Sequence, residues 1–231
     1  GLDQLLARQN PDGGWSWAPV ATDAVVSVNS DPYLTAYMVF GLTRTAQAGV
    51  NFSPEALQRG VEFLTAASTS PDQVTDPGAL DRLTFQYFAL GRAGAANPSA
   101  AGQLYERRSE LSPWAQAFLA LLLEDASPGS QQADTLLTDL QATALRSATG
   151  AHWETSAGHW WNWHTPLSGS AVVIYALAQR QPAAAVLPEA VNYLMSNRNP
   201  NGGWGSSFES AWTLLALAEV MRGTGELSGY F

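Results

Sequence analysis

The sequence predicts an all-α fold, an α/α toroid in which inner helices form a ring and outer helices cover it. Three observations predict this fold. Helical runs are separated by breaks rich in proline, glycine and asparagine, while β-branched alternation is scarce. Helices that are apolar on nearly every face alternate with amphipathic helices. A glycine–tryptophan turn occurs near both ends of the chain, as QNPDGGW at 9–15 and RNPNGGW at 198–204.

We expect about ten helices, five inner and five outer, of a six-fold toroid. Several of them begin with proline at the first helical position, as in Ser53-Pro54, Ser112-Pro113 and Leu187-Pro188. The expected helices cover residues 1–9, 32–48, 54–67, 79–94, 99–109, 113–125, 132–147, 167–180, 186–197 and 207–222.

Four of the predicted inner helices contain the apolar runs TAYMVFGL, QAFLALLL, SAVVIYALA and SAWTLLALA. A helix without a polar face requires protein on every side, so we expect these helices to be buried. Each run places an alanine between a polar residue and a bulky one, which lets neighbouring inner helices approach closely. The helix at 79–94 breaks this pattern. The four triplets are Thr35-Ala36-Tyr37, Gln116-Ala117-Phe118, Ser170-Ala171-Val172 and Ser210-Ala211-Trp212.

Each glycine–tryptophan turn is expected to join an outer helix to the next inner helix. Gly13-Gly14 and Gly202-Gly203 supply backbone conformations that other residues rarely adopt. Trp15 and Trp204 are expected to fold back onto the helix ends. Burying roughly 150–250 Å² of each indole contributes about 4–6 kcal/mol at ~25 cal/mol per Å². We therefore interpret both turns as structural anchors rather than as ligand sites.

The helix count also bears on domain organisation. Ten helices are one pair short of a six-fold toroid, and residue 1 falls inside a predicted outer helix. We therefore expect residues 1–231 to form a single toroid domain, a fragment of a larger multidomain protein whose first helical pair lies upstream.

Composition excludes several classes of function. The chain has 20 acidic and 11 basic residues and a formal charge of −9, which argues against nucleic acid or an anionic membrane as partner. It contains no cysteine, which excludes disulfides, thiolate nucleophiles, zinc–thiolate sites and iron–sulfur clusters. No uninterrupted apolar run approaches the ~18 residues of a membrane span.

The segment TGAHWETSAGHWWNWHTP (149–166) has the densest set of functional side chains, and it leaves three interpretations open. Three histidines with a carboxylate are possible metal ligands, and tryptophans with carboxylates are typical of sugar sites. We favour a structural β-hairpin near 150–164, with its turn at 156–158, because strand alternation would put His159 and His164 on opposite faces. The residues concerned are His152, Trp153, Glu154, His159, Trp160, Trp161, Trp163 and His164.

No catalytic, cofactor-binding or metal-binding residue is predicted, and no cofactor. Asp12 is expected to stabilise its turn, and Asp31 to cap the following helix. The sequence has neither a G-x-S-x-G elbow nor a phosphate-binding loop. Further loop carboxylates show no acid–base spacing, namely Asp23, Asp72, Asp76 and Asp81.

Two enzyme families with a helical toroid resemble parts of this chain. Gln9, Gly13 and Trp15 match the short QW motif of squalene and oxidosqualene cyclases, but Arg198 replaces the glutamine in the second copy. The D-x-D-D acid that such a cyclase needs is absent. Prenyltransferase β subunits bind zinc through a cysteine, and this chain has none. A terpenoid cyclase-like or carbohydrate-active toroid enzyme remains the alternative function.

The chain resembles the thioester-containing, complement-like domain of the alpha-2-macroglobulin family, in particular its bacterial members, over nearly its whole length. The matching stretches are RQNPDGGWSW (8–17), DPYLTAYMVFGL (31–42), GAHWE…WWNW (150–163), SGSAVVIYALA (168–178) and VNYLMSNRNPNGGWGSSFESAWTLLALAEVM (191–221).

This resemblance implies a non-catalytic domain of a bacterial protease trap, or endopeptidase inhibitor, located outside the cytoplasm. It implies neighbouring β-sandwich macroglobulin-type domains in the same chain, and proteases as targets of the parent. The family's C-x-E-Q thioester motif lies upstream of the first glycine–tryptophan turn, so no residue of this chain matches it. Either the motif precedes residue 1 in the parent, or the parent belongs to the bacterial subgroup that lacks it.

Overall fold

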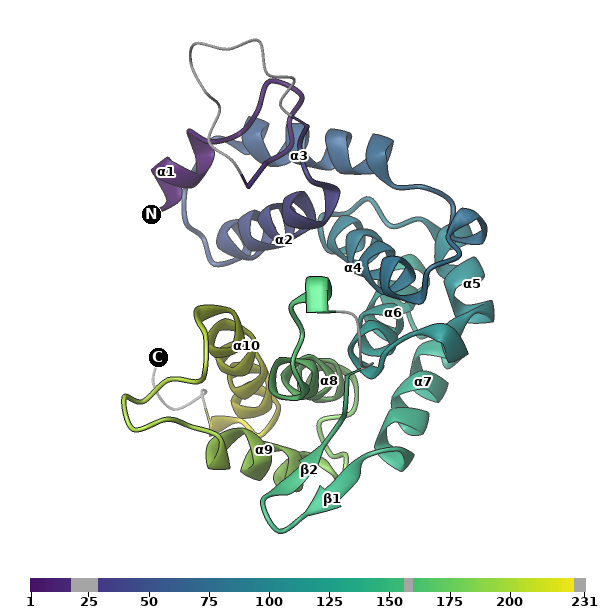
Figure 1. The fold of residues 1–231 in the computed structure, drawn as a ribbon, viewed down its shortest axis with the longest axis vertical. Helices are drawn as coiled ribbons and strands as arrows, with labels where there is room; N and C mark the ends of the chain where they lie inside the picture. Colours follow the sequence, from purple (N-terminus) through teal and green to yellow (C-terminus); the bar gives the residue numbers. More distant parts are fainter. Residues whose placement is uncertain (18–28, 156–159, 227–231) are drawn as a thin grey trace. The chain divides into compact units, whose positions relative to one another are not determined.

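The computed structural model describes residues 1–17, 29–155 and 160–226 (Figure 1). Across these residues it has ten α-helices, three short 3₁₀ helices and one two-stranded antiparallel sheet. The chain divides into two compact units: unit 1 comprises residues 1–106 and 125–127, and unit 2 comprises residues 107–124 and 128–231. All ten predicted helices are present, so the all-α prediction is confirmed.

Unit 1 is built around α2 and α4, and α2 packs against both α3 and α4. In α4, Leu80, Phe85 and Phe88 are completely covered, whereas α3 buries only Gly60 and Leu64. The predicted alternation of buried and half-buried helices is therefore confirmed in this unit. Its elements are α1 (Leu2–Leu6), α2 (Pro32–Gln47), α3 (Pro54–Ala67), η1 (Pro71–Gln73), α4 (Pro77–Arg92) and α5 (Pro98–Glu106).

Unit 2 is built around α8, which packs against α9 and α10. Every residue of α8 from Ser168 to Ala178 is buried, whereas α9 buries only Leu187, Ala190 and Leu194. The same alternation therefore holds here. The elements are η2 (Arg108–Glu110), α6 (Pro113–Ala126), α7 (Gln131–Ala142), β1 (Leu145–Ser147), β2 (Gly150–His152), η3 (Trp160–Asn162), α8 (Pro166–Arg180), α9 (Leu187–Ser196) and α10 (Ser207–Gly223).

Local capping explains where several helices begin. Asp31 accepts a 2.7 Å hydrogen bond from the backbone N–H of Leu34, and Asp76 accepts one of 2.6 Å from Ala79. Each follows the predicted rule for a helix start, with proline in the next position. The expected cap at Asp31 is therefore confirmed.

Four helix predictions require correction. The helix expected at 1–9 ends at Leu6, and the helix expected at 99–109 ends at Glu106, before the 3₁₀ helix η2. The helix expected at 132–147 ends at Ala142, because residues 145–147 form strand β1 instead. The run SAWTLLALA was expected to be buried on every face. In α10, however, Leu214 is 59% exposed and Met221 is 37% exposed, so one stripe of this helix is uncovered by the described residues.

The hairpin predicted near 150–164 is wrong as placed: the described residues form a hairpin at 145–152 instead. β1 pairs antiparallel with β2, with Leu145 opposite His152 and Ser147 opposite Gly150. The run AHWE therefore contributes to the second strand rather than the first. Residues 160–162 form the 3₁₀ helix η3, not a strand, and Ser156–Gly158 lie outside the described residues.

In the described part of the chain, no helix combines the length and the apolar character required to cross a membrane.

Candidate functional site

Three tryptophans are anchored in the same way where an inner helix begins. In each, the indole Nε1–H donates to a carbonyl oxygen of the preceding outer helix, and the backbone N–H donates to a hydroxyl oxygen on the following inner helix. All six hydrogen bonds measure 2.7–3.1 Å. The three sets are Trp15 with Leu5 and Thr35, Trp153 with Leu140 and Ser170, and Trp204 with Leu194 and Ser210.

The sequence interpretation recognised two of these anchors and missed the third. The hydroxyl residue in each set is the first residue of the polar–alanine–bulky triplet, so the triplet fixes the anchor as well as the helix spacing. Trp153 lacks a double glycine before it, which is why it escaped notice. The sequence signals that could have revealed it were the glycine at position 150 and Ser170, the first residue of a polar–alanine–bulky triplet. In the structure Gly150 has a φ of +124°.

The two glycine–tryptophan turns share a hydrogen-bond pattern that explains their common sequence. In the first turn, Asn10 N–H donates to the Gly14 carbonyl and Gly13 N–H to the Asn10 carbonyl, both at 2.9 Å. In the second, Asn199 N–H donates to the Gly203 carbonyl at 2.8 Å, and Gly202 N–H to the Asn199 carbonyl at 2.9 Å. The φ angles of Gly13 and Gly202 are +91° and +87°, a region closed to most other residues.

The side chain before each asparagine donates a hydrogen bond to the same glycine carbonyl in both turns, although the residue types differ. Gln9 donates its side-chain amide to the Gly13 carbonyl at 2.8 Å, and Arg198 donates Nε–H to the Gly202 carbonyl at the same distance. Arginine therefore replaces glutamine in the second turn without loss of the turn contact. Gln9 also reaches the Ala56 carbonyl of α3 at 2.8 Å.

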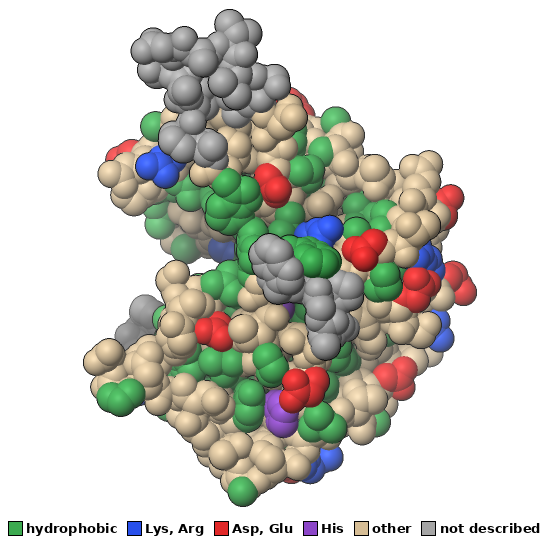
Figure 2. Space-filling view, in the orientation of Figure 1, with side chains coloured by type: hydrophobic (Ala, Val, Ile, Leu, Met, Phe, Trp, Pro, Cys, Tyr) green, Lys and Arg blue, Asp and Glu red, His purple; other side chains and the backbone are tan. Residues whose placement is uncertain are grey.

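Among the described members of the predicted histidine cluster, His152 and Glu154 lie in contact. His152 Nε2 lies 3.2 Å from Glu154 Oε1, and its ring stacks on Tyr193 with centroids 4.6 Å apart. Burial, with the charges of Glu154 and Glu209, raises the pKa of Tyr193. On the face shown in Figure 2 a histidine lies beside an acidic side chain, and basic side chains are scattered rather than gathered in a patch.

His164 is instead part of an aromatic core in unit 2. Its ring stacks on Trp114 with centroids 4.1 Å apart, and it also packs against Phe208 and Trp212 of α10. Burial in these surroundings lowers the pKa of His164 to about 3, so the ring is neutral at pH 7. The following residue, Thr165, donates its hydroxyl to Glu209 at 2.6 Å and so ties this segment to α10.

The metal-ligand hypothesis finds no support in residues 1–17, 29–155 and 160–226, where no three histidines or acidic residues gather as a possible ligand set. His159, the third predicted member, lies outside the described residues. The alternating strand faces expected for 159–163 are wrong, because residues 160–162 form η3, with Asn162 buried and Trp161 38% exposed. Trp163 follows with φ of +62°, a strained value for a bulky residue.

The predicted aspartates mostly serve local structure. Asp12 Oδ1 accepts hydrogen bonds from Gly14 N–H and from the Ser30 hydroxyl, so its expected role in the turn is confirmed. Asp72 lies exposed in η1, and Asp81 is buried in α4. Asp23 lies outside the described residues.

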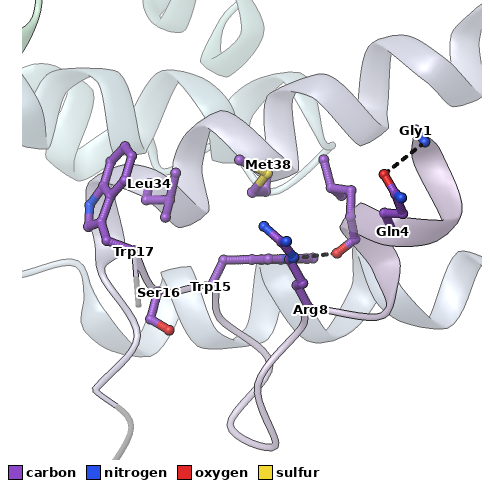
Figure 3. A pocket seen from close by; sticks show the side chains of 9 residues that line it. Gly1, Gln4, Arg8, Trp15, Ser16, Trp17, Leu34 and Met38 are labelled. Carbon is purple, nitrogen blue, oxygen red and sulfur yellow. Dashed lines mark hydrogen bonds between the residues drawn. The ribbon is translucent and has the colours of Figure 1, made fainter. Parts of the chain in front are cut away.

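A cavity lies in unit 1, between α1, the first turn and α2 (Figure 3). It has a volume of about 370 Å³. In Figure 3, Trp17 and Leu34 stand at one side, and Arg8 and Met38 point into the space above Trp15. We call it the α1–α2 pocket.

Comparison with known proteins gives consistent findings. No protein-family model matches the chain. Over 64 residues, 28% of the chain, it is 38% identical to the alpha-2-macroglobulin of Thermotoga maritima, and this stretch is 4% of that protein. The chain therefore spans a small part of this relative.

Solved structures resemble the chain over nearly all of it. Salmonella alpha-2-macroglobulin reacted with methylamine is 19% identical with a TM-score of 0.73, over 94% of this chain and 14% of that one. Native Escherichia coli alpha-2-macroglobulin from domain MG7 to the C-terminus is 16% identical with a TM-score of 0.68, over 96% and 33%. The elastase-activated Escherichia coli protein is 18% identical with a TM-score of 0.72, over 95% and 19%. These similarities confirm the predicted fold class, the all-α toroid.

Proposed function

We propose that this chain, which is a domain of the alpha-2-macroglobulin family, is a non-catalytic scaffold in a bacterial protease trap. The observation that carries the proposal is the extent of the structural similarity, which covers 94–96% of the chain in the Salmonella and Escherichia coli proteins. The local identity of 38% to the Thermotoga protein supports the same assignment from sequence.

In this role the domain presents a reactive thioester carried by the parent and packs against neighbouring β-sandwich macroglobulin-type domains outside the cytoplasm. The Salmonella relative is described as reacted with methylamine, and the Escherichia coli relatives as activated by porcine elastase and by trypsin. Proteases are accordingly the proposed targets of the parent. The three tryptophan anchors support a scaffold role, since each fixes the start of an inner helix to the outer helix before it.

The proposal is tested with the parent protein and trypsin. A trapped protease keeps its activity on a small chromogenic peptide and loses most of its activity on a large protein substrate, because only the small substrate reaches it. We expect this split with the parent and no effect of the 231-residue chain alone on either substrate.

Two controls sharpen this experiment. A parent carrying Trp204→Ala, which removes the second anchor, should trap less trypsin than a parent carrying the exposed substitution Gln58→Ala, because the anchor stabilises α10. Equal loss of activity on both substrates would contradict the trap. Turnover of squalene or of a polysaccharide by the chain alone would instead favour the alternative, a terpenoid cyclase-like or carbohydrate-active enzyme.

A further inference from the structure

From the asparagine to the tryptophan, the two glycine–tryptophan turns differ at one position, and the difference is chemically reactive. Residues 10–15 read NPDGGW and residues 199–204 read NPNGGW, so Asn201 stands where the first turn has Asp12. Asn201 is followed by Gly202, and this is the one Asn–Gly pair in the sequence. Glycine has no Cβ, so its backbone nitrogen is open to the carboxamide carbon of the asparagine before it. The pair therefore has the composition required for closure of a succinimide ring.

The surroundings of the second turn leave room for this ring. Closure bonds Cγ of residue 201 to the nitrogen of the following glycine, so atoms are added beside that glycine. Among the described residues, a Cβ added at Gly202 would meet only the flexible end of the Arg198 side chain, at 3.2 Å. A Cβ added at Gly13 in the first turn would lie 2.5 Å from the backbone oxygen of Arg59 on α3. The same ring would therefore be crowded in the first turn.

The side chain of Asn201 is not held away from the residue that follows it. Asn201 is exposed, and among the described residues its carboxamide makes no hydrogen bond, while its backbone N–H donates to Asn199 Oδ1 at 3.0 Å. In contrast, Asp12 Oδ1 accepts hydrogen bonds from Gly14 N–H at 3.0 Å and from the Ser30 hydroxyl at 2.7 Å. Rotation toward the next backbone nitrogen thus breaks two contacts at Asp12 and no side-chain contact at Asn201.

One hydrogen bond slows ring closure in the folded chain. Gly202 N–H donates to the Asn199 carbonyl at 2.9 Å, and the nitrogen attacks only after it has lost this proton. Exposed turns open locally at a small fraction of the free energy of global unfolding. We therefore expect the ring to close during such openings, and more slowly than in the unfolded chain.

We propose that Asn201 is a site of spontaneous deamidation, for which the chain itself supplies the nucleophile. The Gly202 nitrogen forms a bond to Cγ of Asn201, the Cγ–Nδ2 bond breaks, and ammonia leaves with the proton that the Gly202 N–H gave up. Water then opens the succinimide at either carbonyl, which leaves aspartate or isoaspartate at position 201. The proposal is independent of the proposed function, because it needs only the turn.

The two products affect the second tryptophan anchor differently. An aspartate at position 201 gives the sequence of the first turn, in which Asp12 is accommodated with the same pair of backbone hydrogen bonds. An isoaspartate inserts a methylene into the backbone between Asn199 and Gly203, whose 2.8 Å hydrogen bond closes the turn. Trp204 follows directly. We therefore expect the aspartate form to keep the Trp204 anchor and the isoaspartate form to loosen it.

The test incubates the folded 231-residue chain at mildly alkaline pH and follows each asparagine by peptide mass spectrometry, with chromatographic separation of aspartate from isoaspartate. Asn201 should convert at least tenfold faster than Asn197. Asn197 is also exposed, but it precedes an arginine, and its carboxamide donates to the Tyr193 carbonyl at 2.9 Å. In the separated products, the Trp204 indole N–H should exchange faster in the isoaspartate form than in the aspartate form.

Asp12→Asn is the matched variant, because it places the same dipeptide in the crowded turn and its amide oxygen can accept the same two hydrogen bonds. In the folded chain the introduced asparagine should convert at least tenfold more slowly than Asn201, which corresponds to about 1.4 kcal/mol in the barrier. In urea the two should convert at similar rates, because their neighbouring sequences are the same. Asn201→Gln should abolish conversion at this position, since glutamine would have to close a larger ring.

Three results would overturn the proposal. The first is a conversion of Asn201 no faster than that of Asn197. The second is an equal rate at positions 12 and 201 in the folded Asp12→Asn variant, which would remove the role of the surroundings. The third is an Asn201 that converts in urea and stays intact in the folded chain, which would show that the hydrogen bond to Asn199 closes the site.

Discussion

The two glycine–tryptophan turns are nearly identical in hydrogen bonding and differ in what surrounds them. A Cβ added to Gly13 would lie 2.5 Å from the backbone oxygen of Arg59 on α3, whereas one added to Gly202 would meet only the flexible end of Arg198, at 3.2 Å. Arg59 also donates to the Asn10 carbonyl at 2.8 Å. The comparison separates two roles of one motif: the turn geometry is intrinsic, and its stability depends on the helix packed against it.

The largest expected effect follows from that difference. Gly13→Ala should destabilise the chain by about 2–5 kcal/mol, combining about 1–2 kcal/mol for the left-handed backbone with about 1–3 kcal/mol for the clash with α3. Gly202→Ala should cost about 1–2 kcal/mol, because only the backbone term applies. Urea unfolding of both variants measures the difference. If both variants lose the same unfolding free energy, α3 moves to accommodate the new methyl group, and its packing against the first turn does not add to the cost of the substitution.

Acid should weaken the second turn selectively, because Ser210, which anchors Trp204, lies on α10 beside the His164 core. The folded chain keeps His164 neutral down to a pKa of about 3, while the unfolded chain takes up a proton below about 6.5. The unfolded state therefore binds more protons as pH falls, and stability drops by about 1.4 kcal/mol per pH unit, or about 3 kcal/mol by pH 4.

Hydrogen exchange of the two indole N–H groups at pH 4.5 tests this selectivity. Trp204 should exchange faster relative to Trp15 than it does at pH 7. His164→Phe should remove the effect, since it keeps the ring packing without the titrating group, while His152→Gln should retain it. Parallel acceleration of both indoles would show that acid acts on the whole chain and not through His164.

These comparisons also show what the sequence could predict. Helix positions, the turn anchors and the cap at Asp31 followed from local patterns, because proline, glycine and apolar spacing act over a few residues. The third anchor did not follow. Trp153 and Ser170 lie 17 residues apart without a glycine pair, and the packing of α7 and β2 against α8 brings them together.

The aromatic segment failed for a related physical reason. Alternating aromatic and polar residues at 159–163 match a strand pattern, but residues 160–162 form η3, and the sheet of the described residues has two strands, β1 and β2. Asn162 and His164 are both buried in this segment, where the backbone forms η3 and Trp163 has a positive φ. The α1–α2 pocket could not be predicted from the sequence either, because it depends on the relative positions of α1 and α2.

A smaller effect should distinguish the hydroxyl acceptors of the two turns. Thr35→Val removes the acceptor of the buried Trp15 N–H and should cost about 2 kcal/mol, because a buried donor left unpaired loses its full hydration. Ser210→Ala should cost about 1 kcal/mol, since the Trp204 N–H is only partly buried and water can replace the hydroxyl. Thermal unfolding of both variants measures this order. If Ser210→Ala lost more stability than Thr35→Val, the second turn rather than the first would be the more enclosed one.

The smallest effect is expected where the two turns are chemically interchangeable. Arg198→Gln should change stability by less than about 0.5 kcal/mol, because glutamine makes the same contact to the turn carbonyl in the first copy. Gln9→Met, which keeps the length and removes the amide, should cost about 1–2 kcal/mol, since two hydrogen bonds are lost, one of them to Ala56 on α3. Urea titrations resolve this difference. If Arg198→Gln proves as costly as Gln9→Met, the stacking of Arg198 on Trp204 stabilises the second turn as strongly as α3 stabilises the first.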